Sequence, residues 1–472
     1  MRSFLSLILL AIAACGQGSS WAGVESGLAR AVAEAGRNGL EVGCAVVDPE
    51  SGAQLFGVQA QRLMIPASNE KVFTAAAALL ALGPEHRVLT DLVAHGEVQN
   101  GVLDGVLRLR GEGDPTLESE RVLPHLVARI KAAGIQRVRG ALVLDDRLFD
   151  RELRGPQWPE EDPAKAWMAA VAPLSLDHGT VQVRVRAGAG VGAPAGAEVL
   201  PAGAAPLQSV LITGKSARDH LVAVTRAEGS EVLRVSGRVA PWTKAQAHAV
   251  AVQDPTLAFG NALLAACESA GIRIDGGVRR ADAAQPSGGR LLARLRTRVG
   301  DILPLLLKSS QNHRAEMMFK HLGAAFAGSG SFAGGSRAVH ATLQKAGVDL
   351  GGTVLADGSG LSRANRTTAA ALAQVLCKLW ASPMRREICT ALPHGGEDGS
   401  TLQRRFQDLG AKVCAKTGTL QGVSTLSGFV QGSGGRTLCF SVLVQVAKAG
   451  KLSAREVQDS IVRALARHGP ER

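Results

Sequence analysis

Residues 66–71 read Pro-Ala-Ser-Asn-Glu-Lys, and a run with helix-forming composition follows them as far as Leu82. Gly83-Pro84 then supplies a helix stop signal. We therefore expect Ser68 at the start of a helix, where unpaired backbone N–H groups and the positive end of the helix dipole favour a developing alkoxide. Lys71 comes three residues later, so it lies on the same helical face and within reach of the Ser68 hydroxyl.

Two further patterns, Ser310-Gln311-Asn312 and Lys416-Thr417-Gly418, each occur once and follow in this order. Alone, each pattern is ordinary: Ser-x-x-Lys is usually a capping serine with a solvated lysine, and the other two are usually a turn and a strand end. Together and in order, they are typical of a serine-acylating active site. Lys71 must be neutral to act as a base, through burial or through a neighbouring cation, for which Lys416 is a candidate.

Longer stretches of the chain add to these motifs. They are Leu82-Gly83-Pro84, residues 111–117 (Gly-Glu-Gly-Asp-Pro-Thr-Leu), Ala315-Glu316 after the second motif, and residues 357–363 (Asp-Gly-Ser-Gly-Leu-Ser-Arg). With the three motifs, they resemble the type-four class of low-molecular-mass penicillin-binding proteins, the D-alanyl-D-alanine carboxypeptidase and endopeptidase family. The resemblance runs from about Val24 to the C-terminus. The middle residue of the second motif is often Asp in that family and is Gln311 here, a side chain to which we assign no catalytic role.

The resemblance implies a serine-type D-Ala-D-Ala carboxypeptidase and peptidoglycan endopeptidase that binds penicillin. Lys71 would take the proton of Ser68, whose oxygen attacks the penultimate D-alanine, while Ser310 passes a proton to the departing amine. Asn312 would bind the substrate amide, and Lys416 would supply positive charge beside the substrate carboxylate. The expected catalytic residues are Ser68, Lys71, Ser310, Asn312 and Lys416, and the expected substrate-binding residues are Thr417, Gly418, Thr419 and Asp162.

The oxyanion donors and Asp162 are assigned on different grounds. The backbone N–H groups of Ser68 and Thr419 are the expected oxyanion donors. Asp162 is chosen from the acidic stretch Glu160-Glu161-Asp162, because relatives carry a carboxylate there for the amino group of the stem peptide, although a solvated acidic loop is the more common interpretation. The glycine-rich residues 357–363 could form an anion-binding loop, but we favour the interpretation that they form a loop that braces the cleft.

Motif spacing predicts the domain organisation. Roughly 240 residues separate Ser68 from Ser310, which is enough for one or two inserted domains. We expect an α+β fold: a discontinuous penicillin-binding, β-lactamase-like transpeptidase domain, with an antiparallel sheet and helices, carrying an inserted α+β domain with a nested β-rich module. The expected boundaries are 23–88 with 256–472 for the catalytic domain, 89–179 with 240–255 for the inserted domain, and 180–239 for the nested module.

Local patterns predict elements within these domains. A helix is expected over 24–35, a hairpin over 40–58, a helical region over 301–322, and strands over 412–419, 423–430 and 437–444. A final helix should begin at Ser453 with a capping box to Glu456. Short alternating strands from Thr180 to Val239 surround a Gly/Ala/Pro-rich loop over 187–205.

The N-terminus predicts export. One arginine and a short apolar run suit a signal peptide over 1–22, and the alternative is a leader over 1–14 with a lipidated Cys15. No later run is long enough to span a bilayer. We expect the protein in the periplasm or cell envelope, and leave peripheral membrane association open. Six other cysteines allow fifteen complete pairings, with Cys377 and Cys389 the first choice on proximity in sequence, and free buried thiols equally favoured.

The composition limits the classes of molecule that the protein is expected to bind. The formal charge is +12 and the pI is near 9.8, but the cations are scattered and no nucleic-acid motif appears, so an anionic cell-wall environment is the better explanation. No side-chain spacing indicates a metal site, and no cofactor is implied. The expected partners are peptidoglycan stem peptides and β-lactams, and the sequence does not indicate the oligomeric state. The alternatives are a secreted serine β-lactamase and a non-catalytic peptidoglycan-binding protein. The Tyr-x-Asn motif of class C β-lactamases cannot occur here, because the chain has no tyrosine.

Overall fold

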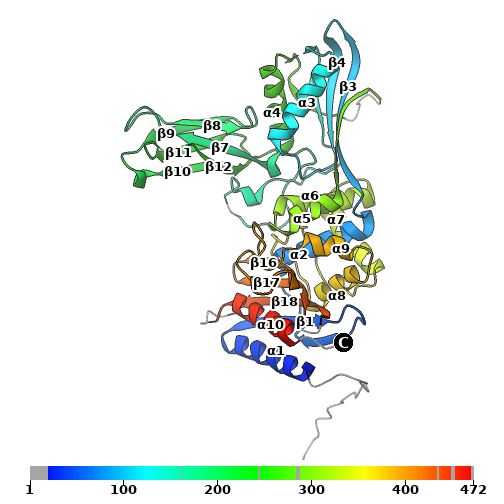
Figure 1. The fold of residues 1–472 in the computed structure, drawn as a ribbon. Coiled ribbons are helices and arrows are strands. Elements are labelled where there is room, and N and C mark those ends of the chain that lie inside the picture. Colours follow the sequence, from blue (N-terminus) through cyan, green and yellow to red (C-terminus); the bar gives the residue numbers. More distant parts are fainter. Residues whose placement is uncertain are drawn as a thin grey trace, which may run out of the picture.

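The computed structural model describes residues 20–160, 162–242, 245–282, 288–432, 435–447 and 452–468. The molecule is elongated: a sheet and two helices from the chain ends lie at one end, a helical layer lies in the middle, and the inserted domains project beyond it (Figure 1). The leader expected over 1–22 and the alternative lipid site at Cys15 lie almost entirely outside the described residues. Among the residues described, no helix has the length and apolar character needed to cross a membrane.

A five-stranded antiparallel sheet joins the two ends of the chain. Its order is β16-β17-β18-β1-β2, with β1 pairing with β18 from Leu40↔Val446 to Val47↔Cys439. The strands are β1 (Leu40–Val47), β2 (Gln54–Val58), β16 (Val413–Leu420), β17 (Val423–Gln431) and β18 (Thr437–Val446). Both the hairpin and the three C-terminal strands are as the sequence predicts.

Helices cover both faces of this sheet. On one face, α1 (Ser20–Arg37) and α10 (Ala454–His468) pack on a core that includes Ile461 and Leu465. The predicted capping box is present, because Ser453 N donates to Glu456 Oε2 at 2.7 Å and Glu456 N donates to Ser453 Oγ at 3.3 Å. The α+β catalytic core built from both chain ends is therefore confirmed.

The opposite face carries the helical layer that holds the first two motifs. It contains α2 (Glu70–Ala77), α5 (Val299–Leu307), α6 (Asn312–Ala327), α7 (Phe332–Lys345), α8 (Ala369–Trp380) and α9 (Arg385–Ala391). Buried side chains such as Phe73 and Phe319 fill one continuous core there. The helix expected from Ser68 to Leu82 starts as a 3₁₀ turn, η1 (Ala67–Asn69), and ends as a π turn, η2 (Ala78–Leu82).

The inserted domain is built on a seven-stranded sheet. Its strands are β3 (Arg87–Gln99), β4 (Val102–Gly111), β5 (Arg137–Val138), β6 (Leu142–Asp145), β13 (Arg273–Ile274), β14 (Val278–Arg280) and β15 (Arg290–Arg298). Helices α3 (Ser119–Ala132) and α4 (Pro255–Ser269) share its apolar core. The expected return to the catalytic domain at residue 256 is therefore wrong. The chain first contributes α4 and three strands to the inserted domain, and returns at α5.

The nested module consists of two three-stranded sheets (Figure 1). One contains β9 (Leu207–Thr213), β10 (Leu221–Arg226) and β11 (Leu233–Val239), and the other contains β7 (Thr180–Arg186), β8 (Gly196–Leu200) and β12 (Gln246–Ala251). Two expectations change here. The module extends past residue 239, because β12 pairs with β7. The loop expected over 187–205 contains strand β8, which pairs with Arg186 and its neighbours in β7.

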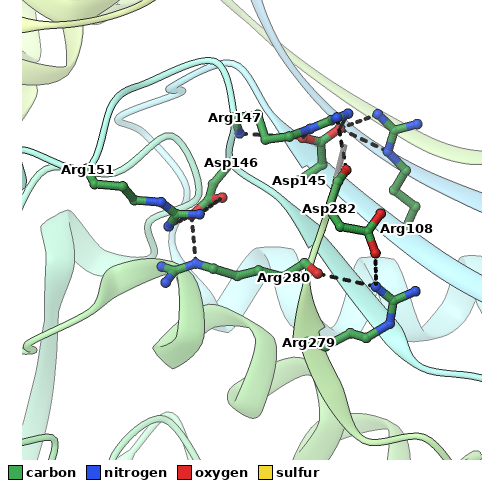
Figure 2. Close-up of polar contacts among 8 residues, drawn as sticks. All are labelled: Arg108, Asp145, Asp146, Arg147, Arg151, Arg279, Arg280 and Asp282. Carbon is green, nitrogen blue, oxygen red and sulfur yellow. Dashed lines mark hydrogen bonds and ion pairs between the residues drawn. The ribbon is translucent and has the colours of Figure 1, made fainter. Parts of the chain in front are cut away.

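Ion pairs fix the end of β6 in the inserted domain (Figure 2). The buried Asp145 carboxylate binds Arg108 and Arg147, and the adjacent buried Asp146 binds Arg151 at 2.8 Å and Arg280 at 3.0 Å. Burial opposes ionisation of Asp145, but its hydrogen bonds to the two arginines prevail and lower its pKa to about 2. These contacts tie together side chains from β4, β6 and β14, so the outgoing and returning parts of the insertion are joined.

The cysteines do not pair as first expected. The six that the structure describes are free thiols, so the Cys377–Cys389 disulfide is wrong in this structure. The Cys389 thiol instead neighbours that of Cys414, and the Cys377 thiol neighbours that of Cys439. The reason is topological: Cys414 and Cys439 flank Phe429 across three adjacent strands, and each faces a helix that supplies one partner.

Candidate active site

Ser68 and Lys71 meet at the start of the first helix, as the spacing predicts. Lys71 Nζ lies 3.0 Å from Ser68 Oγ, 2.9 Å from Asn312 Oδ1 and 2.7 Å from Ser359 O. A neutral amine has two N–H groups for the amide and peptide oxygens, and one lone pair for the serine hydroxyl. The three oxygens can take all three N–H groups of an ammonium, and in the neutral form Nζ keeps two of these bonds and can accept the proton of Ser68.

Burial favours the neutral form of the Lys71 amine. The Lys71 side chain is fully buried, and this burial lowers its pKa to about 8, although the negative charges of Glu316, Asp357 and Glu70 act to raise it. Of the two routes to a neutral lysine that the sequence left open, burial is the one that lowers the pKa of Lys71 here. Lys416 is also fully buried, and its pKa is held well below the ordinary lysine value by burial and by the charge of Lys71.

The third motif lies against the nucleophile. A Cβ atom added to Gly418 would stand 2.9 Å from Ser68 N and 3.0 Å from Pro66 O, so only glycine lets β16 approach the start of the helix this closely. Asn69, with its amide oriented to suit its neighbours, donates to Lys416 O at 2.8 Å and fixes the same junction. Thr417 and Thr419 flank Gly418 on β16, which places the predicted substrate-binding residues at the edge beside Ser68.

The second motif occupies the break between α5 and α6. Ser310 has a left-handed backbone (φ +58°), and α6 begins at Asn312. Both ends of the Asn312 amide form hydrogen bonds: Oδ1 accepts from Lys71 Nζ at 2.9 Å, and Nδ2 donates to Trp167 O at 3.1 Å. Gln311 lines a cavity of about 830 Å³ between α3 and the nested module, so the cleft continues toward the inserted domains.

Residues 357–363 form the loop that braces the cleft, as the glycine pattern predicts. Glu316 Oε2 accepts from Gly358 N at 2.8 Å and Glu316 Oε1 accepts from Ser359 N at 2.9 Å, which aims Ser359 O at Lys71. Asp357 accepts from the backbone N–H of Gly360 at 2.8 Å. Sequence reasoning gave no role to Glu316 or Ser359. The Ala-Glu that follows the second motif and the glycine-rich stretch were the signals that could have found them.

The structure does not join Asp162 to these residues. Asp162 is exposed, and its Oδ1 accepts from Ala164 N at 2.9 Å within its own turn. Nearby Trp158, which the sequence did not single out, reaches the brace loop instead and donates from Nε1 to Asp357 Oδ2 at 2.9 Å. In the part of the chain that the structure describes, no group of three or more His, Cys, Asp or Glu side chains is placed to hold a metal ion.

Comparison with known proteins agrees with this geometry. The model of the D-Ala-D-Ala carboxypeptidase 3 (S13) family matches residues 24–468. The chain is 35% identical over 428 residues to a D-alanyl-D-alanine carboxypeptidase of Actinomadura sp. (strain R39), covering 86% of this chain and 78% of that protein. It is 30% identical over 407 residues to the D-alanyl-D-alanine carboxypeptidase DacB of Haemophilus influenzae, covering 84% of each.

A solved structure is similar over nearly the whole fold. The crystal structure of penicillin binding protein 4 (dacB) from Haemophilus influenzae superposes with a TM-score of 0.79 and 27% identity, covering 93% of this chain and 98% of that one. The same protein complexed with a β-lactam gives a TM-score of 0.74 and 26% identity, with the same coverage. The converging motifs, the family match and the shared fold together show that this chain belongs to the D-Ala-D-Ala carboxypeptidase 3 (S13) family of serine peptidases.

Proposed function

We propose that this enzyme hydrolyses D-Ala-D-Ala peptides of peptidoglycan through an acyl-enzyme on Ser68, and that it cleaves cross-linked peptides by the same route. The observation that carries the proposal is the 3.0 Å contact between Ser68 Oγ and the fully buried amine of Lys71. That distance lies within the range required for a nucleophile and its base.

The reaction balances with the residues in place. Lys71 takes the hydroxyl proton as Ser68 Oγ bonds to the carbonyl carbon of the penultimate D-alanine, and the N–H groups of Ser68 and Thr419 stabilise the oxyanion. The C–N bond then breaks, and the departing amine receives a proton through Ser310. Water hydrolyses the ester, which releases the shortened peptide and restores the Ser68 hydroxyl.

Binding of β-lactams follows from the same chemistry. The Haemophilus influenzae homologue has been solved with a β-lactam bound, and a β-lactam offers Ser68 a strained amide in place of the terminal peptide bond. Because the substrate lies outside the cytoplasmic membrane, we also propose that the enzyme works in the periplasm or cell envelope. Cell fractionation tests that location.

Labelling with fluorescent penicillin tests the proposal. We expect one stable adduct per chain, mapped by mass spectrometry to the peptide that contains Ser68, and its loss in Ser68→Ala. Arg337→Gln, a change at an exposed residue of α7, is the matched control and should label normally. Rapid turnover of the adduct would indicate a β-lactamase, and the absence of any label would indicate a binding protein. Either result would overturn the proposal.

A further inference from the structure

A second cavity shares one wall with the third motif, and its other lining residues have no role in the chemistry described above. It measures about 420 Å³ and lies between β16, the start of α10 and the segment 400–405. Thr417, Gly418 and Thr419 form one wall, so the cavity opens onto the predicted substrate-binding strand. Its other lining residues are Ser400, Thr401, Gln403, Arg404, Arg405, Ser424 and Arg455.

The cavity is basic. Every charged side chain that lines it is an arginine, and only Arg405 has an acidic partner, Asp459, whose oxygen accepts from Arg405 Nε at 3.0 Å. Arg404 and Arg455 are exposed and form no ion pair with any described residue. Thr401 Oγ1 is buried and has no hydrogen-bond partner among the described residues. The cavity therefore presents two free guanidinium groups and an unused hydroxyl, a set suited to a carboxylate ligand.

The cavity lies near the residue that is expected to serve the leaving group of the substrate. Thr401 N donates to Lys308 O at 3.0 Å, which fixes the segment 400–405 beside the connection that carries Ser310. Ser310 is the residue assigned to protonate the leaving amine. One wall of the cavity is therefore fixed to the connection that carries Ser310, and another wall is the strand expected to bind the substrate carboxylate.

Resting on the proposed function, we propose that this cavity binds the stem peptide released when a cross-link is cleaved, through carboxylates that lie beyond the carbon carrying the leaving amine. Free D-alanine, the leaving group of the carboxypeptidase reaction, has one carboxylate and no further peptide to fill 420 Å³. A released stem peptide has additional carboxylates and the length to reach Arg404 and Arg455. The cavity thus favours the endopeptidase substrate over the pentapeptide.

The test compares two substrates on one enzyme. Arg404→Gln and Arg455→Gln, singly and combined, remove charge but retain most of each side chain, and Arg404→Lys and Arg455→Lys retain the charge. For each variant, kcat/KM is measured for D-alanine release from a monomeric pentapeptide and for cleavage of a purified cross-linked dimer. We expect the dimer-to-pentapeptide ratio to fall about tenfold in the double Gln variant, mainly through KM, and to recover in part with lysine.

Two controls make the outcome decisive. Arg337→Gln should keep the wild-type ratio, and a dimer in which only the leaving-strand carboxylates beyond the carbon carrying the leaving amine are amidated should lose the same factor with the wild-type enzyme. An unchanged ratio in the double Gln variant, or equal losses on both substrates, overturns the assignment. Penicillin labelling of Ser68 separates the two proposals: a wild-type enzyme that labels and releases D-alanine but leaves dimers intact keeps its carboxypeptidase function and refutes this role of the cavity.

Discussion

The pH dependence of Ser68 acylation tests whether Lys71 acts as the base. Burial lowers the pKa of Lys71 to about 8, so the neutral amine becomes available as the pH rises through that value. By this pKa, about one molecule in ten carries a neutral Lys71 at pH 7 and about nine in ten at pH 9. We expect the second-order rate constant for penicillin labelling to rise about tenfold between these two pH values and then to level off.

Replacing Glu316 should move this profile in a defined direction. Its carboxylate raises the pKa of Lys71, and burial with the nearby Asp357 raises the pKa of Glu316 itself to about 8, so the two groups titrate together. In Glu316→Gln the negative charge is absent and the ammonium form of Lys71 loses its partner, so the midpoint of the labelling profile should fall. Glutamine keeps an oxygen for one of the two loop N–H groups.

The assay is rapid-quench labelling with fluorescent penicillin between pH 5.5 and 10, followed by gel fluorescence. Glu25→Gln, at an exposed position on α1, is the matched control and should keep the wild-type midpoint. A profile that is flat from pH 7 to 9 would show that the neutral form of Lys71 does not limit acylation. A midpoint that moves upward in Glu316→Gln would show that the electrostatic reasoning has the wrong sign.

Three other measurements probe separate features. Asp145→Asn should reduce the free energy of unfolding by about 2 kcal/mol at pH 7, because the folded protein lowers the pKa of Asp145 to about 2. This contribution is present above about pH 4 and is lost as the pH falls toward 2. An equal loss in denaturant titrations at pH 7 and at pH 2.5 would contradict it. Cys389 should be alkylated before Cys44 in timed mass spectrometry, since Cys389 is partly exposed with a lowered pKa, whereas burial raises the pKa of Cys44 to about 12; early modification of Cys44 would refute this. Gly358→Ala should slow penicillin labelling roughly 10²-fold, because the new Cβ would stand 2.4 Å from Phe319 Cβ and displace the loop that orients Lys71, and a normal rate would show that the loop can adapt.

The sequence predicts best what depends on neighbours in the chain. The meeting of Ser68 with Lys71 follows from helical spacing, and the capping box at Ser453 follows from two residues three positions apart. The hairpin and the C-terminal strands follow from alternation of apolar residues. The chemical roles assigned to Ser310 and Lys416 stay predictions, to be tested by the experiments above.

Features that depend on distant partners were harder to predict. The return from the insertion was placed too early because nothing within Arg290–Arg298 shows that this strand pairs with β3. Thiol neighbours depend on which helix faces which strand, so proximity in sequence misled the choice of Cys377 with Cys389. Glu316 acts through loop N–H groups that come some forty residues later, and although its Ala-Glu motif and the glycine-rich stretch are both visible in the sequence, neither shows locally that the two meet.

The place of β1 in the five-stranded sheet has a consequence for biosynthesis. This N-terminal strand pairs with β18, so the edge that carries Lys416 joins the nucleophile only after almost the entire polypeptide has been made. Contacts of such long sequence separation form late in folding. A ribosome-bound or truncated fragment therefore has Ser68 without the third motif, and peptidase activity first appears in the finished molecule.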